Sequence, residues 1–329
     1  MQELRKSNDR AGLLAEIAEL YYLEGKDQTE IARRVGVTRS MISRMLKEAR
    51  ASGIVEIRIH RSPLSDPSLE KQLMDVFHLE KAFVTRVTDI KKDSQQKHLG
   101  VAGARALGEY LIPNSIVGLA WGTAISATVD AFDPLQQIPA RVVQLVGALG
   151  ATYTEFDGHS LVTRLVQKIN GVAYYLNAPC YCQAHETAKA LMDTPAIRDT
   201  VELGKHVKVA LLGIGSTEKQ YSSFFRSGYI PNDEIDRLHK LGAVGNVVGT
   251  HFNIKGEIVC REFSDHLVVI NEKDLVRIPV RIGVAGGPGK VNPILGALRG
   301  GFINVLVTDA PTASRVLELE AKSRIKANK

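Results

Sequence analysis

The sequence predicts an α/β protein in which a small, winged-helix-like helix-turn-helix unit precedes a large Rossmann-like domain built on a parallel sheet. Three observations lead to this fold class. Residues 27–50 contain two helical patterns separated by a single glycine. Residues 61–70, RSPLSDPSLE, are rich in Pro and Ser and indicate a linker. Apolar runs then alternate with helical stretches. We therefore expect domains at residues 1–60 and 71–329, joined by a linker at 61–70.

The N-terminal unit is expected to contain three helices. Apolar residues recur at helical spacing over Arg10–Glu24, which predicts the first helix. Asp27 is positioned to cap a second helix, and Gly36 ends it. Thr38 is positioned to cap a third helix. A short turn between two crossed helices is the arrangement that reads the major groove of DNA.

The second and third helices have a core side and a solvent side. Ala32 is small where the two helices touch, and Gly36 lies in the tight turn, where a residue without Cβ can adopt positive φ. Four apolar residues of the third helix follow the i, i+3, i+4, i+7 pattern of a core-facing stripe. These residues are Ile42, Met45, Leu46 and Ala49.

The opposite face of the third helix carries candidate DNA contacts. Arg39 and Arg44 can each contact a guanine through two hydrogen bonds, which gives ~1–3 kcal/mol of discrimination. Ser40 and Ser43 can contact bases or phosphates, whereas Lys47 is better placed to hold a phosphate. Residues 26–50 carry seven basic and three acidic side chains, a net charge of +4. The predicted DNA-binding residues are Gln28, Thr38, Arg39, Ser40, Ser43, Arg44 and Lys47.

A basic amphipathic helix with a solvated charged face is the plainer interpretation of this pattern. The spacing of Ala32, Gly36 and Ile42, together with the local charge, favours DNA binding over it. The alternation in IVEIRIH, residues 54–60, predicts a strand that forms a wing or a connector. Arg58 and Arg61 would there be either DNA-backbone contacts or solvated surface.

The rest of the chain is expected to form one parallel sheet with helices on both faces. Seven apolar runs predict its strands, at Ala82–Val87, Ile116–Trp121, Val142–Val146, Val172–Leu176, Val207–Leu212, Ile278–Ala285 and Ile303–Thr308. Helical stretches fall between them, among others at Leu99–Leu111, Leu161–Ile169 and Pro293–Arg299.

Several predicted strands end in glycine-rich turns. Ligands of open α/β sheets bind at the carboxyl ends of the strands, and a helix N-terminus favours an anion. Gly122, Thr123 and Ala124 follow such a strand and precede a helical stretch, so this turn is the best candidate for holding a phosphate. Lys290, after the glycine-rich turn at residues 286–289, adds a positive charge. Ordinary turn geometry is the plainer explanation of each glycine taken alone.

The sequence identifies no catalytic, metal-binding or cofactor-binding residue. The stretch AGGPGKV lacks the first glycine and the Ser or Thr of a phosphate-binding P-loop. No G-x-G-x-x-G follows the first strand of the large domain, and neither G-x-S-x-G nor H-E-x-x-H is present. Asp309, His185 and Glu186 are isolated acid–base candidates.

Composition is that of an ordinary globular protein, with 44% apolar and 24% charged residues in 329. No apolar run is long enough for a membrane span, and the charged N-terminus shows no secretory signal. Cys180, Cys182 and Cys260 cannot form a disulfide framework, and reduced thiols are favoured over zinc binding. We therefore expect a cytoplasmic protein. Its net charge of +6 is a weak indication of a polyanionic partner.

The chain resembles the SorC-type, or DeoR-like sugar-binding, bacterial transcriptional regulators. At the N-terminus the resemblance is carried by AELYYLEGKDQTEIARRVGVTRSMISRMLKEARASGIVEIRI. In the large domain it is carried by VGLAWGTA, VALLGIGS, FRSGYI, GAVGNVVGTHFNIKGEIV, RIGVAGGPGK and NVLVTDAPTA. The resemblance implies a homo-oligomeric regulator, a dimer or tetramer, of a carbohydrate or polyol operon, with repression favoured.

The resemblance also implies that the large domain is similar to sugar-phosphate isomerases but serves as a sensor for a phosphorylated sugar or related polyol. Asn246 stands where the family often has Asp, so it can bond a hydroxyl but carries no charge. The implied effector-binding residues are Gly122, Thr123, Ala124, Gly147, Asn246 and Lys290. Two alternatives stay open: an isomerase- or deaminase-like enzyme with a nucleic-acid-binding head, and a basic protein that binds DNA without sequence preference.

Overall fold

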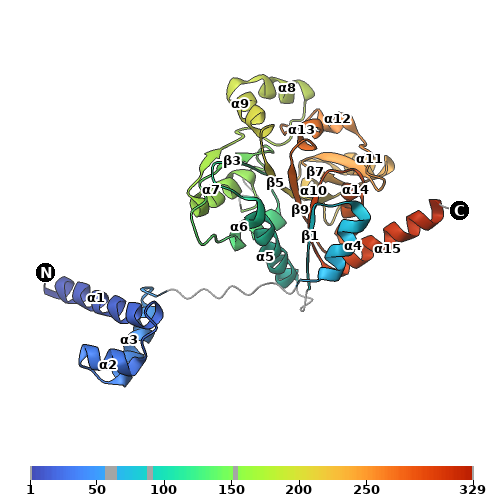
Figure 1. Cartoon of the computed structure of the whole chain (residues 1–329). Helices are drawn as coiled ribbons and strands as arrows, with labels where there is room; N and C mark the ends of the chain where they lie inside the picture. The colour runs from blue at the N-terminus through green and yellow to red at the C-terminus, as the bar shows by residue number, and fades with distance from the viewer. Residues whose placement is uncertain (1, 56–64, 87–91, 151–154, 328–329) are drawn as a thin grey trace. The chain divides into compact units, whose positions relative to one another are not determined.

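The computed structural model describes residues 2–55, 65–86, 92–150 and 155–327 (Figure 1). The chain divides into two compact units, Met1–Ser62 and Pro63–Lys329, each of which has its own core. Within the described residues, no helix combines the length and the apolarity that crossing a bilayer requires.

The small unit contains three helices, α1 (Gln2–Tyr22), α2 (Gln28–Val35) and α3 (Arg39–Ala51). The helix α1 begins before Arg10, the residue at which the sequence pattern starts it. The helical residues before Arg10 are polar except for Leu4, so no apolar spacing there predicted this first part of the helix. The core of the small unit includes the apolar stripe expected on the third helix. The buried apolar residues are Leu14, Ile17, Leu20, Ile31, Ala32, Ile42, Met45, Leu46 and Ala49.

Local caps fix the turn between α2 and α3. The Asp27 carboxylate accepts hydrogen bonds from the backbone N–H groups of Thr29 and Glu30, and the Glu30 side chain returns a bond to the Asp27 N–H. Gly36 ends α2 in the left-handed region at φ 75°, which only glycine adopts without strain. Thr38 caps α3 through the Met41 N–H. The predicted helix-turn-helix is therefore confirmed.

The strand expected at Ile54–His60 is not tested, because residues 56–64 lie outside the described part of the chain. Arg58 and Arg61 lie there too. The two described residues of that segment, Ile54 and Val55, form no strand.

The large unit is built on a seven-stranded parallel sheet in the order β1-β10-β9-β5-β2-β3-β4. Every apolar run predicted as a strand forms one. The strands are β1 (Lys81–Thr85), β2 (Ile116–Leu119), β3 (Arg141–Gln144), β4 (Val172–Tyr174), β5 (Val209–Gly213), β9 (Val280–Val284) and β10 (Val305–Asp309).

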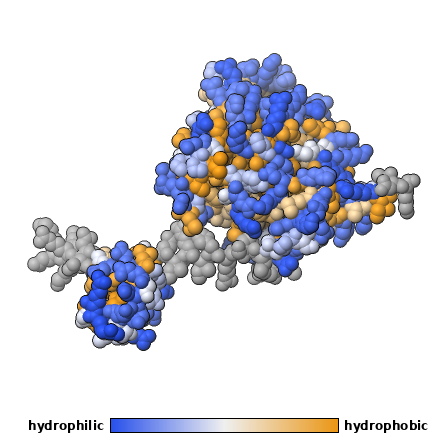
Figure 2. Space-filling view, viewed as in Figure 1, coloured by the Kyte–Doolittle hydropathy of each residue, from blue (hydrophilic) through white to orange (hydrophobic). Residues whose placement is uncertain are grey.

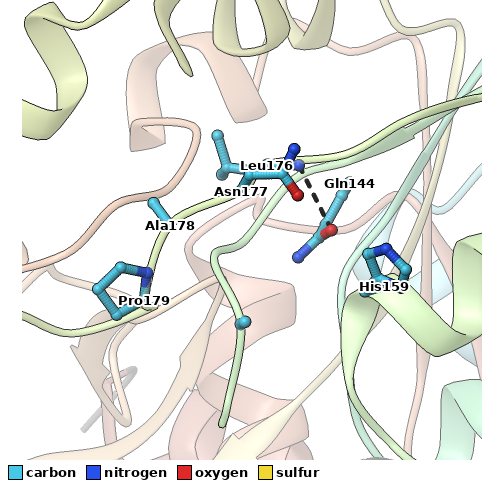
Figure 3. A pocket seen from close by; sticks show the side chains of 7 residues that line it. Gln144, His159, Leu176, Asn177, Ala178 and Pro179 are labelled. Carbon is cyan, nitrogen blue, oxygen red and sulfur yellow. Dashed lines mark hydrogen bonds between the residues drawn. The ribbon is translucent and has the colours of Figure 1, made fainter. Parts of the chain in front are cut away.

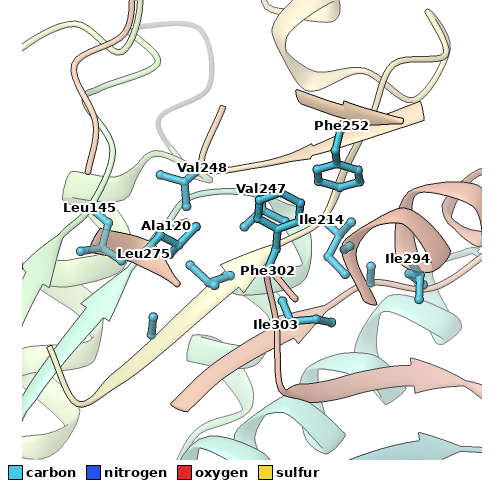
Figure 4. Close-up of a cluster of buried hydrophobic side chains, with 14 of the residues drawn as sticks. Ala120, Leu145, Ile214, Val247, Val248, Phe252, Leu275, Ile294, Phe302 and Ile303 are labelled. Atoms are coloured by element: carbon cyan, nitrogen blue, oxygen red, sulfur yellow. The ribbon is translucent and has the colours of Figure 1, made fainter. Parts of the chain in front are cut away.

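Helices cover both faces of this sheet, as the sequence predicts (Figure 1). One face packs under α5 (Lys92–Tyr110), α6 (Thr123–Ala131) and α7 (Gly158–Ile169). Elements on the other face include α4 (Pro67–Phe77), α11 (Asn232–Lys240), α14 (Val291–Arg299) and α15 (Ala310–Ala327). Figure 4 shows the apolar core on this second face of the sheet, where Ile214, Phe252 and Phe302 come together from different elements.

A second, three-stranded antiparallel sheet on this face was not predicted. It consists of β6 (Gly215–Ser216), β7 (Ala243–Val247) and β8 (Thr250–Asn253). These short strands contain polar and glycine residues, so they do not appear in the sequence as continuous apolar runs. A tight turn at Val248 and Gly249, both with positive φ, joins β7 to β8.

Several helices of the large unit were not predicted individually, among them α4, α11 and α15. The others are α8 (His185–Asp193), α9 (Pro195–Gly204), α10 (Ser223–Arg226), α12 (Arg261–Ser264), α13 (Glu272–Leu275) and the 3-10 turn η2 (Pro288–Lys290). In the view of Figure 2, hydrophilic residues cover most of the large unit, and apolar residues appear as separate spots.

The expected linker is shorter than its composition indicates. Ser65 pairs with Thr85 of β1, and Asp66 caps α4, which begins at Pro67. Residues 65–70 therefore belong to the large unit. Proline and serine there mark the first turn of a helix, a position that proline also favours, so composition alone misplaced this end of the linker.

Candidate functional site

The solvent face of α3 carries three cations that are available for a ligand. Arg39, Arg44 and Lys47 are exposed, and within the described chain none of them has an ion pair or a hydrogen bond. Ser40 is exposed beside them and Ser43 is half-buried. The core stripe on the other side of α3 fixes this face, so the fold presents the predicted side chains together.

The other two predicted DNA contacts have partly different roles. The Thr38 hydroxyl caps α3 and shares a hydrogen bond of 2.9 Å with the Ser40 hydroxyl. Gln28 is the first residue of α2 and is half-buried. Arg50, the last basic residue of α3, is held against Tyr22, with its Nε 2.8 Å from the phenol oxygen.

The orientation of α3 is also fixed by an ion pair to α1. Arg10 donates from Nε and Nη2 to the two carboxylate oxygens of Glu48, at 2.7 and 2.6 Å. These bonds favour the charged forms, so they lower the pKa of Glu48 and raise the pKa of Arg10. This two-bond geometry helps to fix how α1 and α3 lie against each other, and so the direction in which the solvent face of α3 points.

In the large unit, the turn after β2 leaves a helix N-terminus open. Gly122 is the N-cap of α6 at φ 134°, and no side chain accepts hydrogen bonds from the first turn. Thr123 is exposed and Ala124 is half-buried. The Gly122 N–H is bound to the Phe156 carbonyl at 3.1 Å, which ties the turn to the segment before α7. Uncapped N–H groups at a helix N-terminus are the donors that an anion requires.

Lys290 is half-buried at the carboxyl end of β9, at the end of η2. Its Nζ donates to the Ile214 carbonyl at 2.6 Å, which leaves further ammonium hydrogens for a ligand. Burial lowers the pKa of Lys290 to about 8, because desolvation disfavours the charged form. An anion bound beside the ammonium would restore that charge.

Asn246 is connected to Lys290 through neighbouring residues, since Lys290 binds Ile214 and Asn246 pairs with the next residue, Gly215. Asn246 is 7% exposed and pairs with Gly215 of β6, the residue that follows Ile214. A Cβ at Gly215 would lie 2.5 Å from the Asn246 Nδ2, so the glycine makes room for the amide. The turn at Gly122 adjoins the same region, because β2 and β5 are neighbours and the Trp121 carbonyl lies near Gly213.

Gly147 is placed differently from the other predicted effector residues. It follows β3, on the side of β2 away from β5. Its N–H donates to the Val268 carbonyl at 2.9 Å, and a Cβ there would lie 2.7 Å from the Ala178 carbonyl oxygen. The close approach of two backbone segments thus explains this glycine without a ligand.

A cavity of about 360 Å³ opens at the ends of β3 and β4, and none of the predicted effector residues lines it (Figure 3). Its walls include Leu176, Ala178 and Pro179, and they carry no lysine or arginine. Gln144 is the buried polar group there, but its amide already bonds the Val146 carbonyl and the Leu176 N–H. An anion therefore finds better partners at Lys290 and the α6 turn than in this cavity.

The three isolated acid–base candidates have different surroundings. His185 and Glu186 are exposed at the start of α8. Asp309 is 1% exposed, and its carboxylate accepts three hydrogen bonds, from Gln95, Gly287 and Thr312. The role of Asp309 in holding the turn before Lys290 was not predicted, although a lone Asp at the end of an apolar strand is a signal of such a role. No group of three or more potential metal ligands occurs among the described residues.

Comparisons with known proteins identify the family of the chain. Residues 62–318 match the Sugar-bind model, which describes a sugar-binding domain. The sorbitol operon regulator of Klebsiella pneumoniae is 30% identical over 324 residues, which cover 95% of this chain and 100% of the relative. The transcriptional regulator LsrR of Escherichia coli K12 is 31% identical over 311 residues, or 92% of this chain and 94% of the relative.

The solved structures show the same family likeness in the fold. The crystal structure of the full-length sorbitol operon regulator SorC from Klebsiella pneumoniae matches with a TM-score of 0.78 and 28% sequence identity. The match covers 93% of this chain and 98% of that chain, so it includes both units. This chain therefore belongs to the SorC family of transcriptional regulators, which combine a DNA-binding unit with a sugar-binding domain.

Proposed function

We propose that this regulator binds a specific operator through α3 and releases it when a phosphorylated sugar or related polyol binds the large unit. The observation that carries the proposal is the face of α3, where Arg39, Arg44 and Lys47 are exposed without partners among the described residues. Cations that stabilise no part of their own fold are available to DNA.

On DNA, the residues near the start of α3 would contact base edges in the major groove. Arg39 and Arg44 would each donate two hydrogen bonds to a guanine, and Ser40 and Ser43 would contact bases or phosphates. Lys47 would bind a phosphate and set the register. Thr38 and Gln28, at the starts of α3 and α2, would contact the DNA backbone, where helix N-termini face phosphates.

The effector would bind where the ends of β2, β5 and β9 meet. Gly122 would let the backbone approach the phosphate closely, and the phosphate would accept hydrogen bonds from the N–H groups of Thr123 and Ala124 and pair with Lys290. Asn246 would bond a hydroxyl without adding charge. Gly147 would shape the neighbouring loop. The name of the sorbitol operon regulator supports a carbohydrate or polyol operon as the target, and we favour repression.

The regulator would act as a homo-oligomer, a dimer or a tetramer. Two copies related by a twofold axis would present two α3 helices to a pseudo-palindromic operator, with half-sites one helical turn or a multiple apart. Effector binding would favour one arrangement of the copies through its different affinity for the two arrangements.

The test is a gel-shift titration of the full chain with operator fragments selected from genomic DNA. Arg44→Ala should weaken specific binding by roughly 5- to 150-fold, the equivalent of ~1–3 kcal/mol. Arg277→Ala, which removes an exposed arginine of the large unit, is the matched control and should leave binding unchanged. The same fragments are then titrated with sorbitol 6-phosphate, fructose 6-phosphate and their unphosphorylated forms.

Equal operator affinity of Arg44→Ala and the control would show that α3 does not enter the groove as proposed. Sequence-independent binding by the wild-type protein would favour the basic-protein alternative. Turnover of a sugar phosphate by the purified protein would revive the isomerase or deaminase alternative.

A further inference from the structure

A buried carboxylate connects the proposed effector turn to the rest of the large unit. Asp309 ends β10, and its Oδ2 accepts from the Gly287 N–H and from Gln95 Nε2, both at 2.8 Å. Its Oδ1 accepts from the Thr312 N–H at 2.9 Å, at the start of α15. Asp309 thus joins three elements: the turn after β9, the helix α5 and the helix α15.

The turn is shaped around this carboxylate. A Cβ on Gly286 would overlap Asp309 Oδ2, so a side chain there cannot coexist with these bonds. Gly287 adopts φ 97°, and its N–H is bound by Asp309 and by the Thr312 hydroxyl, both at 2.8 Å. Lys290 follows three residues later and donates to the Ile214 carbonyl. A shift of this lysine toward a ligand would therefore act on the bonds of Asp309.

On the side away from β9, β10 pairs with β1, and β1 in turn pairs with the segment through which the chain enters the large unit. In the β1–β10 register, Asp309 lies beside Thr85. Thr85 pairs with Ser65, the first described residue after 56–64. Both backbone groups of the neighbouring Val84 are hydrogen-bonded to this segment. The Val84 carbonyl accepts from the Asp66 N–H at 2.9 Å, and the Val84 N–H donates to Glu70 Oε1 at 3.0 Å.

We infer that Asp309 is a positioning residue that couples the Lys290 turn to residues 65–70, which follow the DNA-binding unit in the chain. This inference rests on the proposed function for its biological meaning. The coupling itself is a property of one continuous set of contacts, from Lys290 through Gly287, Asp309 and β1 to Ser65. Such a set transmits a change only if its two ends respond together, and this response can be measured.

The test is hydrogen–deuterium exchange of the full chain without any ligand. Asp309→Asn keeps the volume of the side chain but replaces an accepting oxygen by a donating amide that faces N–H groups. Loss of a charge-assisted hydrogen bond should speed exchange about tenfold or more in the affected segments. We expect this effect both in the peptide that covers residues 286–290 and in the peptide that covers residues 65–70.

Glu320→Gln is the matched control. Glu320 is another buried carboxylate of the large unit, on α15, and it pairs with Arg299 and Arg324 but does not touch the turn. This variant should leave both peptides at the exchange rates that its overall stability predicts. Gln95→Met, which removes one donor to Asp309, should give the Asp309→Asn pattern with smaller changes and serves if Asp309→Asn does not fold.

Faster exchange at 286–290 with wild-type exchange at 65–70 would overturn the coupling, and so would equal patterns in Asp309→Asn and Glu320→Gln. Because no ligand is used, this result is independent of the proposed function. If sugar phosphates do not change operator binding by the wild-type protein in the gel shift, the proposed function is contradicted. The coupling would still be decided by the exchange experiment alone.

Discussion

The two units place their functional side chains in opposite environments. On α3, the three cations point to solvent, and the described chain gives them no partner. At the strand ends of the large unit, Asn246 is buried, and Lys290 is half-buried and bound to a backbone carbonyl. The three cations of α3 therefore take no part in holding α3 in place, whereas the candidate ligand groups at the strand ends are themselves bound within the fold.

This difference predicts how each region responds to substitution. Substitution of Arg39, Arg44 or Lys47 should change DNA affinity without changing stability, because these side chains make no contact within the described chain that folding requires. Residues at the strand ends should change ligand affinity and local stability together, because removing one partner of a buried hydrogen bond leaves the other unsatisfied.

The largest expected effect lies on the core side of α3. Ile42 is 0% exposed, and Ile42→Ala should lower the free energy of unfolding of the small unit by about 2–5 kcal/mol through the lost burial and the cavity left behind. Differential scanning calorimetry should show a shifted transition for the small unit and an unchanged one for the large unit, with loss of operator binding.

Met41→Ala is the matched control, because Met41 is the neighbouring residue of α3 and is 45% exposed. It should change the free energy of unfolding by no more than about 0.5 kcal/mol. Comparable losses in the two variants would mean that α3 has no distinct core and solvent faces.

An effect of intermediate size is expected at Lys290. Its pKa is about 8 in the free protein, and a bound phosphate, which is a dianion well above pH 6, would favour the charged ammonium. The affinity for sorbitol 6-phosphate, or for another sugar phosphate that binds, should therefore fall about tenfold for each pH unit above 8. Isothermal titration calorimetry at pH 7, 8 and 9 measures this.

Lys290→Met keeps the aliphatic part of the side chain and removes the charge. This variant should bind the sugar phosphate more weakly, and its affinity should not change between pH 7 and 9. The same pH dependence in this variant would remove Lys290 from the site. The stability of the ligand-free protein should depend on pH in the opposite direction from the ligand affinity. Between pH 8 and 10.5 the unfolded chain binds more protons at this lysine than the folded one, so stability should rise with pH across that window.

The smallest effect is expected at Lys47, as a proposed phosphate contact. Lys47→Ala should weaken binding to all sequences alike and make the slope of log affinity against log salt concentration less negative by about 0.9. Lys240→Ala, at the exposed end of α11, should leave the slope unchanged. A loss confined to one operator sequence would instead assign Lys47 to base reading.

The same contrast explains how much could be predicted from the sequence. The periodic burial of α3 and the apolar runs of the main sheet follow from local patterns, and both were predicted. The short strands β6, β7 and β8 were not, because their polar and glycine residues form no continuous apolar run, and β6 is a strand only through its pairing with β7, which lies far along the sequence. The linker end was misplaced for a related reason, since only the contact of Ser65 with Thr85 assigns it to the sheet.

The site in the large unit was predicted residue by residue and not as a network. Glycine-rich turns after strands indicated where a ligand could bind, but Asp309 looked like an isolated acid. Its partners Gln95 and Gly287 lie 214 and 22 positions away in the sequence, so no local pattern connects them. Gly147 shows the converse, because its sequence context resembles a ligand loop while backbone packing already accounts for it.

The contacts of residues 65–70 with β1 also determine where the chain can be divided. β1 is the edge strand of the main sheet, and Asp66 and Glu70 occupy the outward-facing carbonyl and N–H of Val84. An isolated sensor that starts after residue 70 would leave this edge open to pairing with other chains, which is a route to aggregation. A fragment that starts before Ser65 would retain the cover, so its solubility depends on six residues that sequence composition assigns to the linker.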